Sequence, residues 1–489
     1  MPPVAAGLLV FATSAAVLVI EILASRLLAP YVGETLETYT AIIGTVLAGI
    51  ALGAFVGGRL ADRTDPRALI GPTIMLGGAL TLAILPIVGA FGPPLLGGGA
   101  PATVILTSLA FFGPATVLSA VSPMVVKLQL ATLEETGSVV GRLSALGTAG
   151  AIVGTFVTGF VLVAAFPSRP TLLVLGVLVV LGGVGVHLAL RTRTRQPVAA
   201  ILVLGLFGAG FTAVTPSPCD VETAYYCASV ETGLPPCDGL TLYLDTLRHS
   251  CVHPDDPKRL DFTYAQIMGD VITTLAPEGQ PLEALHIGGA GFSLPRWLAA
   301  SRPGSGSLVL ELDPTLVQIA EDRLGLVTGP DLRVDVGDAR LGLEQQPDDA
   351  YDLVIGDAFG GLAVPWHLTT REFTAEIART LRPGGIYAVN LIDYPPLGFA
   401  RAEAATLRDV FAHVAVIAPR ERLNRAGGGN FVLVGSDQPI ATEAILAANA
   451  ARADNDAVAT GPALDAFIGD TQILRDDYAP VDQLLTPGA

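Results

Sequence analysis

The chain has 489 residues, of which 51% are hydrophobic and only 15% charged, and its mean hydropathy is +0.57. This length exceeds what one core fills, which predicts at least two domains, and the apolar excess excludes an ordinary, fully soluble protein. The net charge of −17 argues against nucleic acid as a partner.

Charge and hydropathy divide the chain into two unlike halves. Residues 1–215 contain ten Lys or Arg and seven Asp or Glu, so this half carries +3. The other 18 basic and 38 acidic residues lie in 216–489, which carries −20. We expect a transmembrane helical domain over 1–215, a linker with cysteines and a β-hairpin over 216–262, and a nucleoside-binding domain over 263–489.

The first half contains seven apolar segments long enough to cross about 30 Å of hydrocarbon, so membrane lipid is its expected partner. Small residues are frequent in these segments, which suits close helix packing in lipid. The first segment lacks a basic flank and is followed by further spans, so we do not interpret it as a signal peptide. This half is either a packed anchor or a channel or carrier. The predicted spans lie near 4–25, 37–58, 69–92, 102–126, 143–166, 171–190 and 198–215.

The basic residues of the loops predict the orientation of these spans. The loops after the second, fourth and sixth spans hold eight Lys or Arg, whereas those after the first, third and fifth hold only Arg26 and Arg169. Positive residues concentrate on the cytoplasmic side of a membrane. We therefore expect a multi-pass protein of the cell membrane with a cytoplasmic N-terminus and, after seven spans, an extracytoplasmic soluble domain.

The four cysteines lie within 33 residues, directly after the last predicted span. Two disulfides would fit the predicted orientation, because disulfides persist in oxidising compartments. The spacing does not match a zinc ribbon and no metal is expected, although a metal site and free buried thiols are the alternatives. The candidates for disulfides are Cys219, Cys227, Cys237 and Cys251.

The second half alternates short apolar runs with helical patterns. A hairpin begins at TLYLD (241–245) and is followed by a helix from about Phe262. The alternation that follows is typical of an α/β Rossmann-like sheet, which binds ligands at the carboxyl ends of its strands. In the tail we expect a strand pair, a helix near 441–453 and a loop over 454–461. The strands are predicted at 283–288, 307–311, 331–335, 352–356, 385–391, 412–418 and 430–435, and the other helices at 293–301, 314–323 and 370–381.

Glycine follows the first of these strands. Gly288 and Gly289 let the backbone approach a ligand closely, and a helix N-terminus comes next. We expect both residues to contact a nucleoside-type ligand.

Acidic residues end the next three strands. Glu311 is placed to accept ribose hydroxyls, Asp338 to accept an adenine amino group, and Asp357 to face a reacting group. Three successive acids are harder to explain by chance than any one of them. Capping of the following helix is the alternative, and it is the better interpretation for Asp313.

Five segments resemble the spermidine synthase family of polyamine aminopropyltransferases. The upstream segments YLDTLRHS and FTYAQIM resemble the hairpin of that family and the helix behind it. The resemblance covers about residues 240–395. With the multi-span N-terminal half, the chain resembles bacterial membrane-fused spermidine-synthase-like proteins. The five segments are IGGAG, LELD, VGDAR, GDAF and LTTREFTAEIARTLRPGGIYAVN.

The resemblance implies transfer of an aminopropyl group from decarboxylated S-adenosylmethionine to an amine such as putrescine, with methylthioadenosine as the product. Asp357 matches the position of the family's proton acceptor. Glu311 matches its ribose ligand, and Asp338 and Ala339 match its adenine contacts. The resemblance also implies a homodimer.

The acceptor side departs from the family pattern. Tyr264 of the helix motif is kept, and His249 stands where the family has a nucleoside-contacting Gln. Gly291 and Gly360 replace two acids, and Ala265 replaces an amine-contacting His. Each lost charge-assisted contact is worth about 1.5–3 kcal/mol, so tight putrescine binding in the usual manner is not expected.

Three functions stay open on this basis. The first is a membrane-bound aminopropyltransferase-like enzyme, in which Asp393, Asp476 and Asp477 are candidates to replace the lost acids. The second is another S-adenosylmethionine-dependent transferase, such as a methyltransferase, which the lost amine contacts favour. The third is a non-catalytic sensor or transporter that binds a polyamine or nucleoside; the predicted outside location supports it, because the adenosyl donor is made in the cytoplasm.

Overall fold

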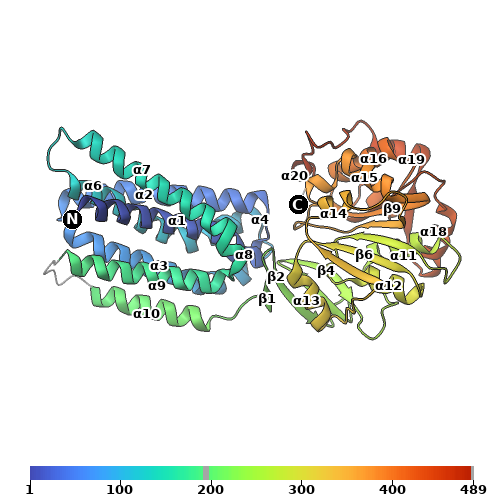
Figure 1. Ribbon diagram of the computed structural model, residues 1–489, viewed down its shortest axis with the longest axis horizontal. Helices are drawn as coiled ribbons and strands as arrows, with labels where there is room; N and C mark the ends of the chain where they lie inside the picture. Colours follow the sequence, from blue (N-terminus) through green and yellow to red (C-terminus); the bar gives the residue numbers. More distant parts are fainter. Residues whose placement is uncertain (191–197, 486–489) are drawn as a thin grey trace. The chain divides into compact units, whose positions relative to one another are not determined.

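The computed structural model describes residues 1–190 and 198–485. The chain forms two compact units, Met1–Ala228 and Ser229–Ala489 (Figure 1). Their boundary falls inside the segment 216–262, which was predicted to be a linker with a hairpin.

The first unit is helical, as predicted. Among the described residues, six helical segments are long and apolar enough to cross a membrane. The seventh predicted span corresponds to α10 (Val198–Val214), whose 17 residues lie at the lower end of the range of about 17–25 for a crossing, so the count of seven stays a prediction. The fourth and fifth segments each contain a short π-helix. The six segments are α1 (Pro3–Val32), α2 (Leu36–Arg63), α3 (Pro66–Leu95), the run α4 (Gly99–Thr107), η1 (Ser108–Phe112), α5 (Gly113–Ser119) and α6 (Val121–Gln129), the run α7 (Thr136–Val157), η2 (Thr158–Leu162) and α8 (Val163–Ala165), and α9 (Ser168–Ala189).

Glycines set the spacing of these helices. A Cβ atom built on Gly53 of α2 would lie 2.1 Å from the backbone oxygen of Thr116 in α5. A Cβ on Gly150 of α7 would lie 2.2 Å from the backbone oxygen of Phe11 in α1. The helices therefore meet backbone to backbone, in the small-residue mode of membrane helix packing.

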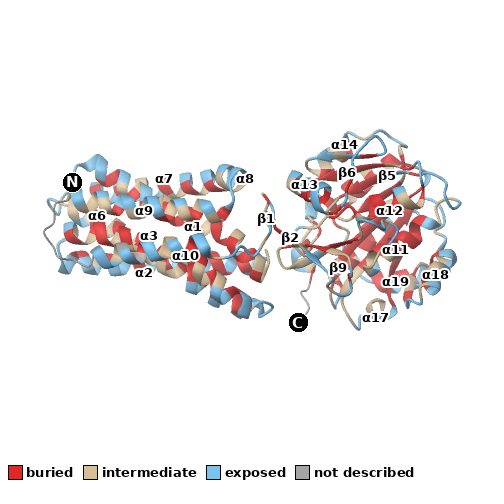
Figure 2. Ribbon diagram, turned by 90° about the horizontal axis from the view of Figure 1, so that it is seen from below, coloured by how far each residue is buried: buried red, intermediate tan, exposed pale blue. Residues whose placement is uncertain are grey.

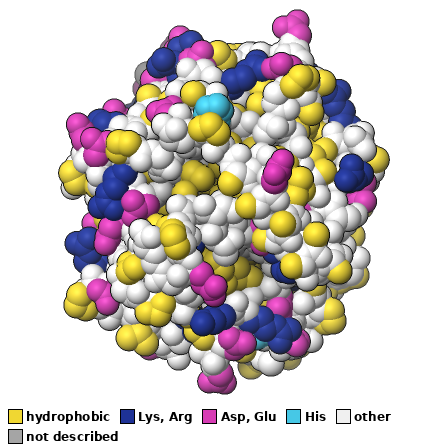
Figure 3. Space-filling view, turned by 90° about the vertical axis from the view of Figure 1, so that its right-hand side faces the viewer, with side chains coloured by type: hydrophobic (Ala, Val, Ile, Leu, Met, Phe, Trp, Pro, Cys, Tyr) yellow, Lys and Arg dark blue, Asp and Glu magenta, His cyan; other side chains and the backbone are white. Residues whose placement is uncertain are grey.

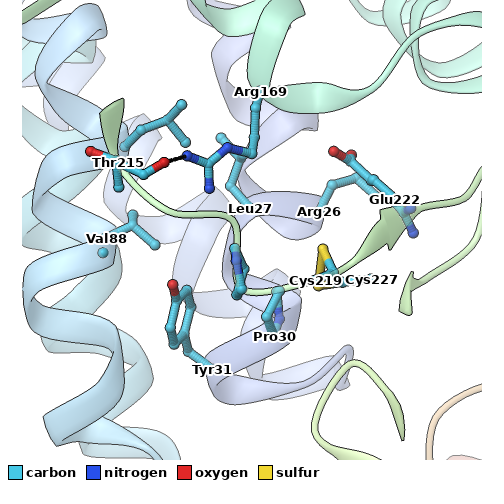
Figure 4. A pocket seen from close by; sticks show the side chains of 13 residues that line it. Arg26, Leu27, Pro30, Tyr31, Val88, Arg169, Thr215, Cys219, Glu222 and Cys227 are labelled. Carbon is cyan, nitrogen blue, oxygen red and sulfur yellow. Dashed lines mark hydrogen bonds between the residues drawn. A yellow bond between two sulfur atoms is a disulfide. The ribbon is translucent and has the colours of Figure 1, made fainter. Parts of the chain in front are cut away.

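Two arginine side chains form hydrogen bonds with the backbone of the segment that follows α10. Arg26 of α1 and Arg169 of α9 each donate to two backbone carbonyls. Figure 4 shows the hydrogen bond between Arg169 and Thr215. Within this segment β1 (Val221–Glu222) pairs with the start of β2 (Cys227–Thr232), and Cys219 is bonded to Cys227. The acceptors are the carbonyl oxygens of Thr223 and Tyr225 for Arg26 and of Thr215 and Pro216 for Arg169.

The second unit begins with the predicted hairpin. Strands β3 (Leu240–Leu244) and β4 (Leu247–Val252) pair antiparallel, and Cys237 is bonded to Cys251 of β4. Helix α11 (Thr263–Thr273) follows the hairpin.

An eight-stranded sheet forms the centre of this unit within the described residues. Its order is β12-β10-β11-β9-β8-β5-β6-β7; the five strands from β9 to β7 are parallel, and β11, β10 and β12 continue the sheet antiparallel. The carboxyl ends of the parallel strands therefore share one edge, as predicted. The strands are β5 (Glu283–Ile287), β6 (Gly306–Glu311), β7 (Leu332–Val336), β8 (Tyr351–Gly356), β9 (Leu381–Asp393), β10 (His413–Pro419), β11 (Gly429–Ser436) and β12 (Asp456–Ala459).

Helices cover both faces of the sheet with apolar side chains (Figure 2). One face packs against α11, α12 and α18, and the other against α14, α15, α16 and α19. The face of the molecule in Figure 3 carries acidic and basic side chains interspersed. The helices are α12 (Ser293–Ser301), α13 (Pro314–Arg323), α14 (Ala339–Glu344), α15 (Arg371–Thr380), α16 (Gly398–Val410), α17 (Arg420–Leu423), α18 (Thr442–Ala451), α19 (Gly461–Ile468), α20 (Val481–Leu484) and the 3-10 turn η3 (Trp366–Leu368).

The tail contains four helices that were not predicted, α16, α17, α19 and α20, and it contradicts the prediction in one segment. The segment 454–461, predicted to be a loop, contains β12, which pairs antiparallel with β10. The prediction was wrong because this segment is rich in polar residues and has a low propensity for strand. It forms a short edge strand because it pairs with β10.

Candidate active site

The glycine loop after β5 follows a path that its sequence dictates. Gly288 has a φ of +90°, and a Cβ atom there would lie 2.7 Å from the backbone oxygen of Asp357. Only glycine meets both requirements. At Gly289 a Cβ atom would lie 2.6 Å from the ring of Phe292. The loops after β5 and β8 thus lie in contact, ahead of the N-terminus of α12.

Glu311 at the end of β6 is bonded to this loop. Its Oε2 accepts hydrogen bonds from the backbone N–H groups of Gly289 (2.8 Å) and Ala290 (3.2 Å), and its Oε1 accepts one from Asp313 (2.9 Å). The side chain is 6% exposed, and burial raises the pKa of its carboxyl. A carboxylate has about four acceptor positions, so this one retains capacity for a further donor such as a ribose hydroxyl.

Asp338 caps α14 in this structure. Its Oδ1 accepts hydrogen bonds from the backbone N–H groups of Arg340 (2.9 Å) and Leu341 (3.1 Å). Its Oδ2 lies 3.2 Å from Nε2 of His367, a neighbour that no sequence pattern indicated. Ala339 is buried at the start of the helix. Asp338 thus has a structural role as the cap of α14. The predicted contact of Asp338 and Ala339 with adenine stays a prediction.

Asp357 follows β8 and faces the hairpin and α11. Its Oδ2 accepts a hydrogen bond from the Tyr264 hydroxyl (3.2 Å), and its Oδ1 accepts one from Nδ2 of Asn390 (2.9 Å). Burial raises the pKa of the Asp357 carboxyl to about 7, and the two donors only partly oppose this shift. The Tyr264 hydroxyl also lies 3.4 Å from the backbone oxygen of His249. The structure thus brings together Asp357, Tyr264 and His249, which the sequence placed far apart.

His249 is uncharged at neutral pH, because burial lowers the pKa of its ring to about 4. The ring meets that of Phe359 edge to face, with the centroids 6.3 Å apart.

Asn390 on β9 was missed as a site residue. It is 1% exposed, and its Oδ1 accepts a hydrogen bond from Nδ2 of Asn430 on β11 (3.0 Å). A signal for it was present, because an amide interrupts the otherwise apolar run YAVNLI in a central strand. A buried amide requires partners, which marks such a position for attention.

The three departures from the family pattern differ in their surroundings. At Gly291 a Cβ atom would lie 2.6 Å from Cβ of Ser250, and the Ser250 hydroxyl accepts the Gly291 N–H (3.0 Å). Ala265 is 4% exposed and packs in the core beneath the sheet. Gly360 is exposed, and a Cβ atom there would meet only the edge of Pro365, at 3.9 Å.

Two of the acids considered as replacements have structural partners. Asp393 accepts the backbone N–H groups of Tyr394 (2.7 Å) and Ala400 (2.9 Å), and Asp476 pairs with Arg340 (2.5 Å). Asp477 is exposed. The cysteines are bonded as Cys219–Cys227 and Cys237–Cys251, so their sulfurs are not thiolate ligands.

The α/β unit has the fold shared by spermidine synthases and methyltransferases, with candidate site residues at the carboxyl edge of its parallel strands. No family model matches the chain. It is 29% identical over 243 residues to a polyamine aminopropyltransferase of Vibrio vulnificus (strain CMCP6), covering 48% of this chain and 80% of that protein. A probable spermidine synthase from Corynebacterium glutamicum is 26% identical over 53% of this chain and 97% of its own, with a TM-score of 0.49. The spermidine synthase of Thermotoga maritima is 15% identical over 43% and 69%, with a TM-score of 0.33. The predicted resemblance to the spermidine synthase family is confirmed by the Vibrio relative, whose name is that of a transferase.

Proposed function

We propose that the α/β unit transfers an aminopropyl group from decarboxylated S-adenosylmethionine to a polyamine such as putrescine, as part of a membrane-bound enzyme. The observation that carries the proposal is the Asp357 carboxylate, which Tyr264 and Asn390 hold at the end of β8 with a pKa of about 7. The name of the Vibrio relative, polyamine aminopropyltransferase, supports the reaction class.

The reaction requires a neutral amine. The amine nitrogen forms a bond to the donor carbon beside the sulfonium while the bond from that carbon to sulfur breaks, and methylthioadenosine leaves with the electron pair. An ammonium ion has no free electron pair, so one proton must leave it, and the Asp357 carboxylate accepts that proton. A pKa near the working pH suits a general base, since the carboxylate is ionised and still basic.

The donor side of the site fits an adenosyl ligand. The glycine loop has no side chain larger than the methyl group of Ala290, and it leads into the N-terminus of α12. Glu311 has acceptor capacity for a ribose hydroxyl beside the hydrogen bonds it makes to Gly289, Ala290 and Asp313. We propose that Gly288, Gly289, Glu311, Asp338, Ala339 and His249 bind the donor and that Tyr264 lies on the acceptor side.

One observation favours a second candidate, another S-adenosylmethionine-dependent transferase. Ser250 occupies the space that an acidic side chain at position 291 would need. A diamine would therefore lack the anionic partner that the family provides there. A transferase whose acceptor is not a diamine would not need that partner.

Product analysis by mass spectrometry separates the two candidates. We expect the full-length protein in lipid nanodiscs to convert decarboxylated S-adenosylmethionine and an amine into methylthioadenosine and the aminopropylated amine. Glu311→Gln should weaken methylthioadenosine binding by about tenfold or more, since a hydrogen bond to a charged group contributes about 1.5–3 kcal/mol. A methylated product from S-adenosylmethionine would instead support the second candidate. No binding of either nucleoside would contradict both.

We also propose that the α/β unit lies outside the cytoplasm. Arg26 and Arg169, the two exceptions to the predicted charge asymmetry, hold backbone carbonyls of the segment after α10, so a structural role accounts for them. The paired cysteines support the same side, because disulfides persist in oxidising compartments.

Thiol labelling of intact cells tests this location. We expect a membrane-impermeant maleimide to label the protein only after an impermeant reductant has opened the disulfides. All four cysteines lie between residues 219 and 251, so the label reports on this segment alone. Labelling that requires permeabilised cells would place the segment in the cytoplasm.

A further inference from the structure

The two oxygens of the Asp357 carboxylate have donors of different kinds. The Tyr264 hydroxyl has one hydrogen and two acceptors within reach, Oδ2 of Asp357 at 3.2 Å and the backbone oxygen of His249 at 3.4 Å. Its hydrogen can therefore turn away from Asp357. The Asn390 amide nitrogen, at 2.9 Å from Oδ1, always presents a hydrogen. The lasting donor to Asp357 is thus Asn390.

The orientation of the Asn390 amide decides whether it donates or accepts. A carboxamide has an NH₂ end and an oxygen end, and a flip would turn the oxygen toward Asp357. Asn390 is 1% exposed, so water does not satisfy its oxygen. That oxygen instead accepts a hydrogen bond from Nδ2 of Asn430 at 3.0 Å.

The sheet register brings Asn430 to this place. Asn390 of β9 pairs with Val432 of β11, so Asn430 lies two residues along on the same face, within reach of a diagonal contact. Arg422 of α17 donates to the backbone oxygen of Asn430 (3.2 Å). Asn430 is partly exposed, so its own side-chain oxygen can face water while its NH₂ group faces Asn390.

We propose that Asn430 and Asn390 form a directional amide relay that keeps a donor on Oδ1 of Asp357, favours the ionised carboxylate and leaves Oδ2 for the incoming proton. Asn390 and Asn430 are positioning residues in this relay, and the inference rests on the proposed role of Asp357 as base. Titratable side chains near Asp357 in the described structure include Tyr264 from α11, which donates to it, and Tyr387 from β9, whose hydroxyl lies beside Gly356. The ring of His249 from β4 lies against Phe359.

Each member of the relay can be changed separately. Asn390→Leu removes the donor to Asp357 at similar size. Asn430→Asp keeps size but offers only acceptors, so it should turn the Asn390 NH₂ group toward position 430 and the Asn390 oxygen toward Asp357. Asn430→Leu removes the constraint without adding charge. Asn424→Asp is the matched control, because it makes the same chemical change at an exposed position six residues away.

The readout is the pH titration of the Asp357 carboxyl by infrared difference spectroscopy, with the full-length Asp357→Asn protein as the blank. We expect Asn390→Leu and Asn430→Asp to raise the Asp357 pKa by about one to two units, since each removes a hydrogen bond to a charged group. Asn430→Leu should raise it less, and Asn424→Asp should not change it. If Asn390→Leu fails to fold, Asn430→Leu carries the test, because it removes the constraint at a half-buried position without adding charge.

Unchanged titration in Asn390→Leu and Asn430→Asp would overturn the relay. A shift in Asn430→Asp alone, with Asn390→Leu folded and unshifted, would also overturn it, because added charge then explains the shift. The titration needs no substrate, so a protein that transfers nothing would contradict the proposed function while still reporting on the relay.

Discussion

Asp357→Asn is expected to lower kcat/KM for aminopropyl transfer by about 10²- to 10⁴-fold, the range for a positioned general base. The new amide cannot accept the proton that must leave the amine. The substitution suits its surroundings: the amide oxygen can still accept from Asn390, and the amide NH₂ can donate to Tyr264, whose own hydrogen then turns to the backbone oxygen of His249. The loss should therefore be chemical, with methylthioadenosine binding retained.

The same residue sets the pH dependence of the unmodified protein. The Asp357 pKa is raised to about 7, so the carboxylate is ionised above that pH and protonated below it. We expect kcat/KM to fall as the pH drops through about 7, and the fall to be absent in the residual activity of Asp357→Asn. Initial rates of methylthioadenosine release across this range check the expectation. An acidic limb near the ordinary pKa of an Asp would contradict the raised pKa of Asp357.

A stability measurement gives an independent check on the raised pKa. The Asp357 pKa is higher in the folded protein than in the unfolded chain, so between about pH 4 and 7 the folded state binds more protons. The Asp357 carboxyl therefore makes the folded protein less stable as the pH rises through this window. Asp357→Asn lacks this carboxyl, so this part of the pH dependence should be absent in the variant. We expect the variant to equal or exceed the parent protein in thermal stability at pH 8, with the difference closing toward pH 4. Equal pH dependence of the two proteins would contradict the raised pKa of Asp357.

The sequence predicted most of the α/β fold because its signals are local. Parallel strands buried on both faces appear as short apolar runs, and β5, β6, β8, α12 and α13 lie within one or two residues of their predicted places. The edge strand β12 was missed because its order comes from pairing with β10. Helix α15 was predicted because its apolar residues lie on one face. Helix α14 was not predicted, because its six residues are too few to show such a pattern.

The candidate site was predicted in part for the same reason. Glycine and acidic residues at strand ends can be recognised one at a time, so the sequence was enough to propose Gly288, Glu311 and Asp357 as site residues. The Asn390–Asn430 contact depends on the register of two antiparallel strands joined through a long connection, which no local pattern shows. Likewise, only the structure shows that Ser250 fills the space beside Gly291.

Gly53→Leu is expected to destabilise the helical unit strongly. Overpacking in a core costs about 1–3 kcal/mol when side chains can move aside, and more when they cannot. Here even the Cβ atom would lie 2.1 Å from the backbone oxygen of Thr116, and a backbone atom of α5 cannot move without the helix. We expect a lower thermal midpoint in nanodiscs and loss of the monodisperse peak in size exclusion.

Gly44→Leu is the control on the same helix, since a Cβ atom at Gly44 meets no atom within 4 Å. Both variants add the same side chain to α2, so a difference between them isolates the contact with α5 from helix propensity and from hydrophobicity. Gly57, one turn beyond Gly53, would have its Cβ 2.4 Å from the backbone oxygen of Ala120, so Gly57→Leu should repeat the loss. If Gly53→Leu matches Gly44→Leu, α2 and α5 do not meet backbone to backbone. If Gly53→Leu is instead less stable than Gly44→Leu, the close contact between α2 and α5 is required for stability. That result favours a fixed membrane anchor over a carrier in which these two helices separate.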